Sequence, residues 1–484
     1  MRHEAIDVRM MGAIHETIDE PEARRETRDI RRVSSLSSCT PVSRLTSRAT
    51  APWPKATASA RCPKKLEEIC LFIADCPHST APDEGHGFPL VRTPNVGNGR
   101  LIFEKMHRVS RAVYETRNKR AKPQAGDLIY AREAPAGNVA LITKGQEVCL
   151  GQRTVLLRPN PAMADSAFLT YYLLAPEQRH RLLGTATGAT VTHVNLPAIR
   201  NLEVILPPLP VQRRIADILS AYDDLIENNR RRIAILEETA RLTYRKWFGG
   251  AKKSDWGMRR DTIDDQGLGV RHETIDDPHV LSLASKAPRV TRLTSHAQSR
   301  VATLGEICRE VRRGVSPDAI APDTPYIGLE HMPRRSISLC EWESAQKVTS
   351  TKLAFEAGDI LFGKIRPYFH KVGITFVDGV ASSDAIVIKP LRPELHAYVL
   401  MTVSSDVFVA AASQGMKEGS KMPRADWKQL LNYSVAMPDD DTLAEFNKVL
   451  NPILEQLKTL CFSIRNLATA RDMLLPRLMK GEMV

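Results

Sequence analysis

The sequence lacks the features that mark membrane-spanning, secreted and metal-binding proteins. No apolar run approaches the ~20 residues that a membrane-spanning helix requires, and the segment after Met1 has no apolar core of the kind found in signal peptides. The 8 cysteines stand at irregular spacings without a C-x-x-C pair, which argues against a zinc site or a disulfide framework. We therefore expect a reduced, cytoplasmic protein that binds no metal and contacts no membrane.

Catalytic motifs are missing as well. The chain has no G-x-x-x-x-G-K-[ST] loop and no Asn/Asp-Pro-Pro-aromatic word for adenine methyl transfer, and its His-Glu pairs are not completed to H-E-x-x-H. His193 and His370 have no neighbouring nucleophile and acid that would form a catalytic triad. The sequence predicts a chain without catalytic residues of its own and without a cofactor.

The charge balance favours a polyanionic partner. Lys and Arg exceed Asp and Glu, and the formal net charge is +12. Neutralising phosphates releases counterions, so nucleic acid is the first partner to consider. Charge alone does not decide this, because many basic proteins bind nothing acidic.

Two stretches that lie 231 residues apart repeat one hydrophobic pattern. Gaps of three and four residues keep apolar side chains on one seam of a helix, as in a coiled coil. The first seam consists of Leu219, Tyr222, Ile226, Asn229, Ile233, Leu236, Ala240, Thr243 and Trp247, and the second of Leu450, Ile453, Leu457, Leu460, Ile464, Leu467, Arg471, Leu474 and Leu478. We predict two long helices that bury these seams against each other. The polar Asn229 either fixes the register or marks a wet stretch of seam.

The same offset relates residues outside the helices. Pro207 maps onto Pro438, and the Ala-Gly-Asp word that starts at Ala125 maps onto the one at Ala357 with a slip of one residue. Strands are predicted at 101–103, 127–130, 138–143, 154–157, 202–206, 359–362, 372–376, 385–388 and 433–437, and helices at 167–174, 177–183 and 395–412. Each half is therefore expected to hold a unit of mixed α/β character.

These patterns divide the chain into six segments. Echoed His-Glu-Thr-Ile-Asp words and Ser/Thr/Arg-rich runs occupy residues 1–60 and 251–300. We interpret both as low-complexity and disordered, without a known role. The remaining segments are a first globular unit at 61–206, a long helix at 207–250, a second globular unit at 301–437 and a second helix at 438–484.

Several words resemble one protein family. Residues 206–219 read LPPLPVQRRIADIL and residues 223–229 read DDLIENN, which resembles the first conserved region of type I restriction–modification specificity subunits. Residues 475–482, LPRLMKGE, resemble the close of the second such region, and AGDILFGKIRPY at 357–368 with Ser-Ser-Asp at 382–384 resembles a target-recognition domain. The resemblance spans about residues 62–482. The insertion at 251–300 departs from the family, which joins the two parts more compactly.

The resemblance implies a fold and a set of partners. The fold is mixed α/β, with two target-recognition domains separated by two long helices that pack as an antiparallel coiled coil, in a pseudo-twofold internal repeat. The partners are double-stranded DNA, methyltransferase (modification) subunits and a translocase–nuclease (restriction) subunit. At ~1.5 Å per residue, a helix over 211–248 would span on the order of 57 Å, more than the ~34 Å between successive turns of B-DNA. Such a rod could hold two readers on a bipartite site with an unread gap.

Candidate DNA contacts are polar residues in predicted loops or at strand ends. Arg can grip guanine and Asn adenine with two hydrogen bonds, whereas Lys more often neutralises phosphate. The candidates are Arg92, Asn95, Arg100, Arg132, Arg153, Thr190 and His193 in the first unit, and Tyr326, Lys364, Arg366, His370, Lys371, Lys417 and Lys421 in the second. A solvated surface charge is the alternative for each of them. Two other functions stay open: a stand-alone regulatory DNA-binding protein and a coiled-coil scaffold.

Overall fold

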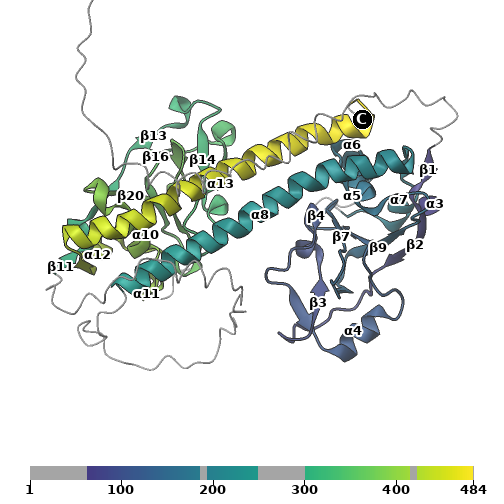
Figure 1. Ribbon diagram of the computed structural model, residues 1–484, viewed down its shortest axis with the longest axis horizontal. Helices are drawn as coiled ribbons and strands as arrows, with labels where there is room; N and C mark the ends of the chain where they lie inside the picture. The colour runs from purple at the N-terminus through teal and green to yellow at the C-terminus, as the bar shows by residue number, and fades with distance from the viewer. Residues whose placement is uncertain (1–62, 186–192, 249–299, 415–421, 483–484) are drawn as a thin grey trace, which may run out of the picture. The chain divides into compact units, whose positions relative to one another are not determined.

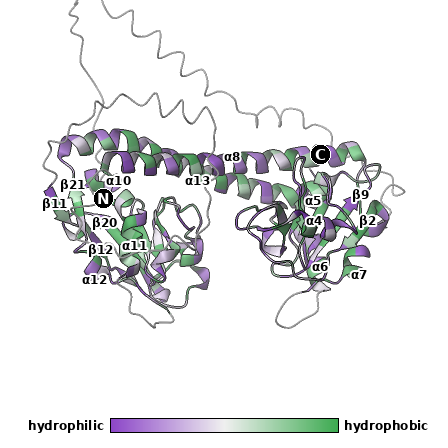
Figure 2. Ribbon diagram, turned by 90° about the horizontal axis from the view of Figure 1, so that it is seen from below, coloured by the Kyte–Doolittle hydropathy of each residue, from purple (hydrophilic) through white to green (hydrophobic). Residues whose placement is uncertain are grey.

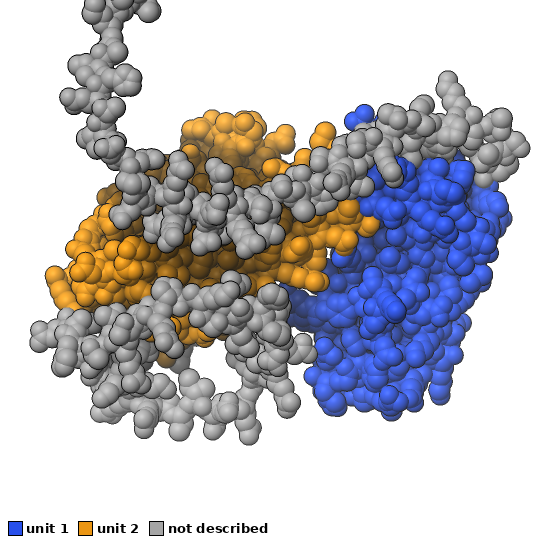
Figure 3. All heavy atoms as spheres, viewed as in Figure 1, with its two compact units in different colours: residues 1–218, 476–484 blue, residues 219–475 orange. Residues whose placement is uncertain are grey.

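The computed structural model describes residues 63–185, 193–248, 300–414 and 422–482 (Figure 1). The predicted segment at 1–60 and all of 251–300 except Arg300 lie outside these ranges. The chain divides into two compact units (Figure 3). Unit 1 holds the described residues up to Ile218 and from Pro476 onward, and unit 2 holds Leu219–Leu475.

Unit 1 is built on a five-stranded sheet of order β2-β9-β6-β7-β4, with a three-stranded sheet β5-β3-β8 and a two-stranded ribbon β1-β10. The strands are β1 Lys64–Lys65, β2 Cys70–Asp75, β3 Phe88–Val91, β4 Gly99–Arg100, β5 His107–Val109, β6 Leu128–Ala131, β7 Val139–Leu141, β8 Cys149–Leu150, β9 Thr154–Pro159 and β10 Glu203–Val204. The helices are α3 Leu66–Ile69, α4 Arg111–Asn118, α5 Ser166–Leu174, α6 Pro176–Gly184 and α7 Leu196–Arg200. Central strand β6 is buried at every residue and contributes side chains to the hydrophobic core of the unit.

Unit 2 contains a four-stranded sheet β12-β20-β17-β18, a five-stranded sheet β13-β16-β19-β14-β15 and the ribbon β11-β21. The strands are β11 Arg300–Thr303, β12 Cys308–Val311, β13 Gly314–Val315, β14 Pro325–Ile327, β15 Glu343–Ser344, β16 Lys352–Phe355, β17 Ile360–Gly363, β18 Val372–Ile374, β19 Gly379–Ala381, β20 Ala385–Pro390 and β21 Ser434–Met437. The short helices are α10 His396–Val403, α11 Asp406–Gln414 and α12 Trp427–Leu430.

The strand order confirms the internal repeat. The run β2-β9-β6-β7 of unit 1 and the run β12-β20-β17-β18 of unit 2 have the same antiparallel connectivity. Each unit also closes with a ribbon between its first and last strands, β1-β10 and β11-β21. The prediction of two mixed α/β units is therefore confirmed.

The repeated Ala-Gly-Asp words form the same turn in both units. Gly126 and Gly358 have φ angles of +93° and +96°, a region in which a Cβ atom would be strained. The carboxylates of Asp127 and Asp359 each accept a hydrogen bond from the backbone N–H three residues earlier, at 3.0 and 2.8 Å. The turn leads directly into β6 and β17, so the repeated sequence sets the start of the central strand in each unit.

Two long helices are present, α8 Leu209–Phe248 and α13 Asp440–Lys480, and the parts of them that belong to unit 2 lie side by side and antiparallel (Figure 1). Both carry hydrophobic and hydrophilic residues along their length (Figure 2). Every seam position predicted above is buried or half-buried. Ala240 of α8 and Phe446, Leu450 and Leu457 of α13 belong to one hydrophobic cluster with the globular part of unit 2. The paired helices are confirmed.

Polar side chains cross the seam at two places. The Asn229 amide donates to the hydroxyl of Ser463 at 3.1 Å, so this seam position is bonded across the pair. Arg471 donates to the carboxylate of Asp223 at 2.5 Å. Buried polar pairs of this kind favour one register over its neighbours, because a shift by one heptad would leave them without partners.

Some element boundaries differ from the predictions. Helix α13 begins at Asp440 rather than at 438, and Asp439 caps it by accepting from the Thr442 N–H at 2.7 Å. The strand predicted at 101–103 lies earlier, at β4. The predicted helix at 395–412 is two helices that meet at 65°, because the Ser405 hydroxyl accepts from the Phe408 N–H and starts α11 anew.

The expectation of a reduced protein is wrong for one cysteine pair. Cys340 and Cys461 form a disulfide with a Cα–Cα distance of 5.0 Å. They are 121 residues apart in sequence, so their spacing along the chain did not suggest a pair. The free cysteines among the described residues, Cys70, Cys76, Cys149 and Cys308, are all buried.

The described helices were also compared with the requirements of a membrane span. No single helix in these ranges is both long and apolar enough. The bent pair Pro393–Val403 and Asp406–Gln414 meets the length and composition requirements only when the two helices are taken together.

Candidate nucleic-acid interface

In unit 1, three chain segments meet where central strand β6 ends. The Arg132 N–H donates to the Arg153 carbonyl at 2.9 Å, and the Val194 N–H donates to the Arg132 carbonyl at 3.0 Å. These two bonds hold the residue after β6 between the start of β9 and the segment that precedes α7. We call this arrangement of three hydrogen-bonded backbone segments the reading frame of unit 1, in a structural sense that has nothing to do with codons. It places Arg132, Arg153 and His193, all predicted candidates, next to one another.

Their side chains form a continuous polar network. Buried Arg132 donates two 2.9 Å bonds to the Asp75 carboxylate and a third bond, also 2.9 Å, to Nε2 of His193. Because a guanidinium only donates, Nε2 of His193 accepts, and the Nδ1–H donates to Glu133 at 2.5 Å. Glu133 also pairs with Arg153 at 2.7 Å. The network runs from a buried ion pair outward to an exposed arginine.

Arg153 is the outermost member of the network. Its side chain is 60% exposed, so the donors that do not contact Glu133 face solvent. Its backbone φ is +65°, in a region that few residues other than glycine occupy. A guanidinium held by a carboxylate and by a constrained backbone is pre-organised for a planar acceptor such as a base edge or a phosphate.

Unit 2 contains the same reading frame. The Lys364 N–H donates to the Asp384 carbonyl at 2.8 Å, and the Ala425 N–H donates to the Lys364 carbonyl at 2.9 Å. The backbone bonds therefore match those of unit 1, but the side chains differ. The Asp384 carboxylate replaces the Arg153 guanidinium, and Arg424, which pairs with Asp384 at 3.2 Å, replaces His193.

A groove of about 690 Å³ opens beside the reading frame of unit 2. Its lining includes the cations Arg312, Lys364, Arg424 and Lys428 and the carboxylates Glu310 and Asp426. Arg312 is paired with Glu310 at 2.8 Å. The excess of cations over carboxylates gives this groove the charge that a phosphate backbone requires.

The structure sorts the fourteen candidates by exposure. Arg100 and Arg153 are exposed, and Arg92, His193, Tyr326, Lys364, Arg366 and Lys371 are half-buried. Asn95, Arg132 and His370 are buried. Thr190, Lys417 and Lys421 lie outside the described residues.

The buried candidates are occupied by internal hydrogen bonds. Asn95 donates to the Ile102 carbonyl at 3.2 Å, and His370 contacts the Ser404 carbonyl at 2.8 Å. Together with the Arg132 network, these contacts show that the three side chains are buried and hydrogen-bonded within unit 1 or unit 2. Direct contact with DNA stays a prediction for all fourteen candidates.

Known proteins resemble this chain over most of its length. Residues 63–238 match the type I restriction modification DNA specificity domain. The type I restriction enzyme MjaIX specificity subunit of Methanocaldococcus jannaschii is 21% identical over 434 residues, which cover 87% of this chain and 93% of that protein. This chain is therefore similar to type I restriction–modification specificity subunits, and its residues 63–238 match their DNA specificity domain.

Further comparisons agree with this family. The HindI specificity subunit of Haemophilus influenzae is 21% identical over 189 residues, 38% of this chain and 40% of that protein. The crystal structure of the S subunit from M. genitalium shares the fold with a TM-score of 0.50 at 14% identity, over 89% of this chain and 99% of that chain. At this identity the likeness shows a shared fold.

Sequence reasoning missed four residues of the reading frames. Asp75 and Glu133 orient the cations of unit 1, and Asp384 and Arg424 occupy the frame of unit 2. A signal for the last two was available in the sequence. Adding the repeat offset of 231 to Arg153 gives Asp384, and adding it to His193 gives Arg424. Asp75 and Glu133 had no such signal, because their roles depend on side-chain pairing.

His370 makes the stability of unit 2 depend on pH. Burial lowers the pKa of His370 below its ordinary value, although the Ser404 carbonyl and the nearby Asp406 carboxylate partly offset this effect. The folded state therefore binds a proton at this ring less readily than the unfolded state. Its contribution to stability is complete above about pH 6.5 and is lost as the pH falls toward the lower folded value, with a slope of at most about 1.4 kcal/mol per pH unit.

The prediction is tested by unfolding the protein in urea between pH 5 and pH 7.5. We expect His370→Gln to flatten the fall in the free energy of unfolding below pH 6.5. His86→Gln, which alters an exposed histidine of unit 1, should leave the profile unchanged. Identical profiles for the wild type and His370→Gln would contradict the assignment.

Proposed function

We propose that this chain reads a bipartite DNA site, with one recognition domain for each half. We assign the domains to residues 61–206 and 301–437. The observation that carries the proposal is the repeated reading frame, in which the same backbone bonds present different side chains. Two readers of one design with different polar groups are what recognition of two unlike short sequences requires.

The chemistry of the two frames favours different bases. Arg153 in the first frame offers donors that suit the O6 and N7 acceptors of guanine. Asp384 in the second frame offers acceptors that suit the amino group of cytosine, next to the donors of Arg424. Exposed and half-buried Lys and Arg around the frames would contact phosphates and set the position of each domain on the duplex.

We assign methyl transfer and cleavage to partner subunits, because the sequence has neither the Asn/Asp-Pro-Pro-aromatic motif of adenine methyl transfer nor the G-x-x-x-x-G-K-[ST] loop that a translocase needs. The partners are a methyltransferase and a translocase–nuclease, and the paired helices α8 and α13 offer them a long continuous surface. The same helices would set the separation of the two readers, since a packed pair resists bending better than a flexible linker. A cytoplasmic location goes with this role.

Single substitutions in the frames are expected to relax selectivity in one half only. Arg153→Ala should reduce discrimination at one base pair of one half by about 5- to 150-fold, because a bidentate contact contributes roughly 1–3 kcal/mol. Arg424→Ala should act on the other half. Arg111→Ala removes an exposed arginine of α4 that lies outside the frame and should change no base preference. Selectivity is measured by methylation of randomised duplexes.

The function is tested with the chain assembled with its methyltransferase partner. We expect adenine methylation of duplexes that carry two short defined elements at one fixed gap. A stand-alone regulator would instead bind a defined site without the partner. A scaffold would show no sequence-selective binding in either preparation, and that result would overturn the proposal.

A further inference from the structure

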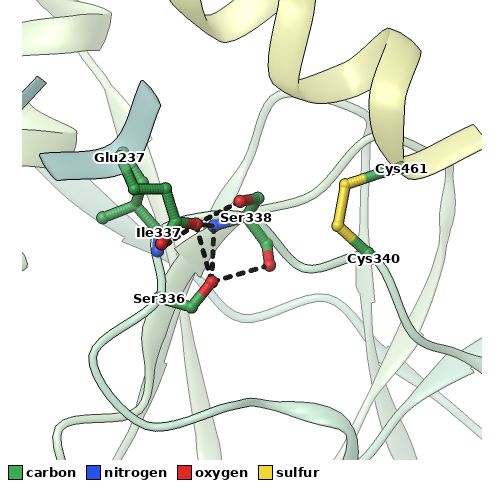
Figure 4. Close-up of a disulfide and its surroundings, with 6 residues drawn as sticks. All are labelled: Glu237, Ser336, Ile337, Ser338, Cys340 and Cys461. Atoms are coloured by element: carbon green, nitrogen blue, oxygen red, sulfur yellow. Dashed lines mark hydrogen bonds between the residues drawn. A yellow bond between two sulfur atoms is a disulfide. The ribbon is translucent and has the colours of Figure 1, made fainter. Parts of the chain in front are cut away.

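A loop of unit 2, residues 335–342, contacts both long helices. It lies between the 3-10 helix at Leu329–His331 and strand β15. We call residues 335–342 the fastening loop. Figure 4 shows Glu237 of α8 pointing at one end of this loop and Cys461 of α13 bonded to the other.

On the α8 side, one buried carboxylate accepts hydrogen bonds from several donors of the loop. Glu237 is 5% exposed, and its Oε1 accepts from the Ser336 hydroxyl at 2.7 Å, the Ile337 N–H at 3.1 Å and the Ser338 N–H at 3.0 Å. The Ser338 hydroxyl donates to the same oxygen. A charged acceptor with several donors binds more strongly than a neutral pair and only in one orientation.

On the α13 side, a disulfide and contacts to an aromatic ring join the loop to the helix. Cys340 is joined to Cys461 by the disulfide. One helical turn further along α13, the Arg465 guanidinium lies 4.1 Å from the centre of the Trp342 ring and donates to the Trp342 carbonyl at 3.1 Å. Phe462 meets the same ring edge-on, with centroids 5.9 Å apart.

The fastening loop is also bonded to the sheet that carries the reading frame. The Ile374 N–H of β18 donates to the Ile337 carbonyl at 2.8 Å, and the Leu339 N–H donates to the Ile374 carbonyl at 3.1 Å. Strand β18 pairs with β17, and β17 ends next to Lys364 of the frame. A continuous path of directional bonds therefore leads from Glu237 to the reading frame.

We propose that Glu237 is a positioning residue, which together with the Cys340–Cys461 bond sets the angle of the second reading frame on the helix pair. The hydrophobic cluster between the helices and the sheet supplies most of the free energy that holds them together. It does little to fix the angle between them, because apolar burial is non-directional. The fastening loop adds the directional bonds. The consequence is a strict gap between the two half-sites, and this inference rests on the proposed function.

The experiment measures gap preference in complexes of the full chain with its methyltransferase partner. Duplexes keep both half-sites and vary the gap from two base pairs shorter to two base pairs longer. We expect the wild type to methylate one gap. Glu237→Leu with Cys340→Ala should lower the preference for that gap over its neighbours about tenfold, the factor that ~1.4 kcal/mol represents. The bases read in both halves should not change.

Matched variants separate positioning from folding. Glu237→Gln keeps an acceptor oxygen and should lose less gap preference than Glu237→Leu, and Glu238→Leu on the exposed side of the same helix turn should lose none. If Glu237→Leu fails to fold, Cys340→Ala and Glu237→Gln decide the question. An unchanged gap preference in folded variants overturns this inference alone. A wild type that shows no bipartite site overturns the proposed function instead.

Discussion

Exchanging residues 62–206 for the matching segment of another specificity subunit is expected to change one half of the methylated site and leave the other half intact. The segment has its own hydrophobic core, which includes Ile129, Ala140 and Leu156. Its ends also meet, because β1 pairs with β10 in the register Lys64 to Val204. The exchange therefore joins new chain at a single ribbon and leaves α8 unchanged.

The size of the effect follows from the cost of mismatches. Each mismatched base pair typically costs about 1–3 kcal/mol, so three mismatches in one half would lower methylation of the original site by more than about a hundredfold. The methylated sequences of cells that carry the hybrid are read out directly. A new sequence in both halves, or in neither, would contradict the assignment of one reader to each half.

Inserting one heptad into each long helix is expected to lengthen the unread gap. The insertions belong at the boundary between the units, after Ile218 in α8 and after Leu475 in α13, where they leave the Asn229–Ser463 and Asp223–Arg471 pairs in register. A heptad adds ~10 Å of helix. Because a turn of about 10.5 base pairs spans ~34–36 Å, the gap should grow by up to about three base pairs.

An insertion in α8 alone serves as the control for this experiment. It displaces one seam against the other, so apolar and polar positions no longer match, and assembly should be impaired. The gap is read from methylation of duplexes with gaps of every length. An unchanged gap in the doubly extended protein would show that something other than the helices sets the separation.

The long helices and the repeat could be predicted because their signals are local. The 3-4 spacing alone identifies the seam residues of both helices. The repeated Ala-Gly-Asp sequences form a turn whose glycine has a positive φ. The features that could not be predicted from the sequence depend on contacts between segments that are distant along the chain. Strands such as β14 and β15 have only two or three residues, too few for an alternating pattern to stand out.

The site was predicted in part for the same reason. Residue type and loop position selected Arg132, Arg153 and His193 as candidates, but the contacts that bring these three side chains together could not be predicted. Burial of Arg132 depends on Asp75, which lies 57 residues earlier. Nothing in the sequence around Glu237 distinguishes it from the other charged residues of α8, because its partners in the fastening loop lie about 100 residues further along the chain.

The most direct test maps methylated adenines in cells that produce this chain with its methyltransferase partner. The same map is made in cells that lack the gene for this chain, and the two are compared. We predict methylation at a single two-part sequence with one gap length, present only when the chain is present. Methylation of an uninterrupted sequence, or a pattern that persists after deletion, would contradict the account.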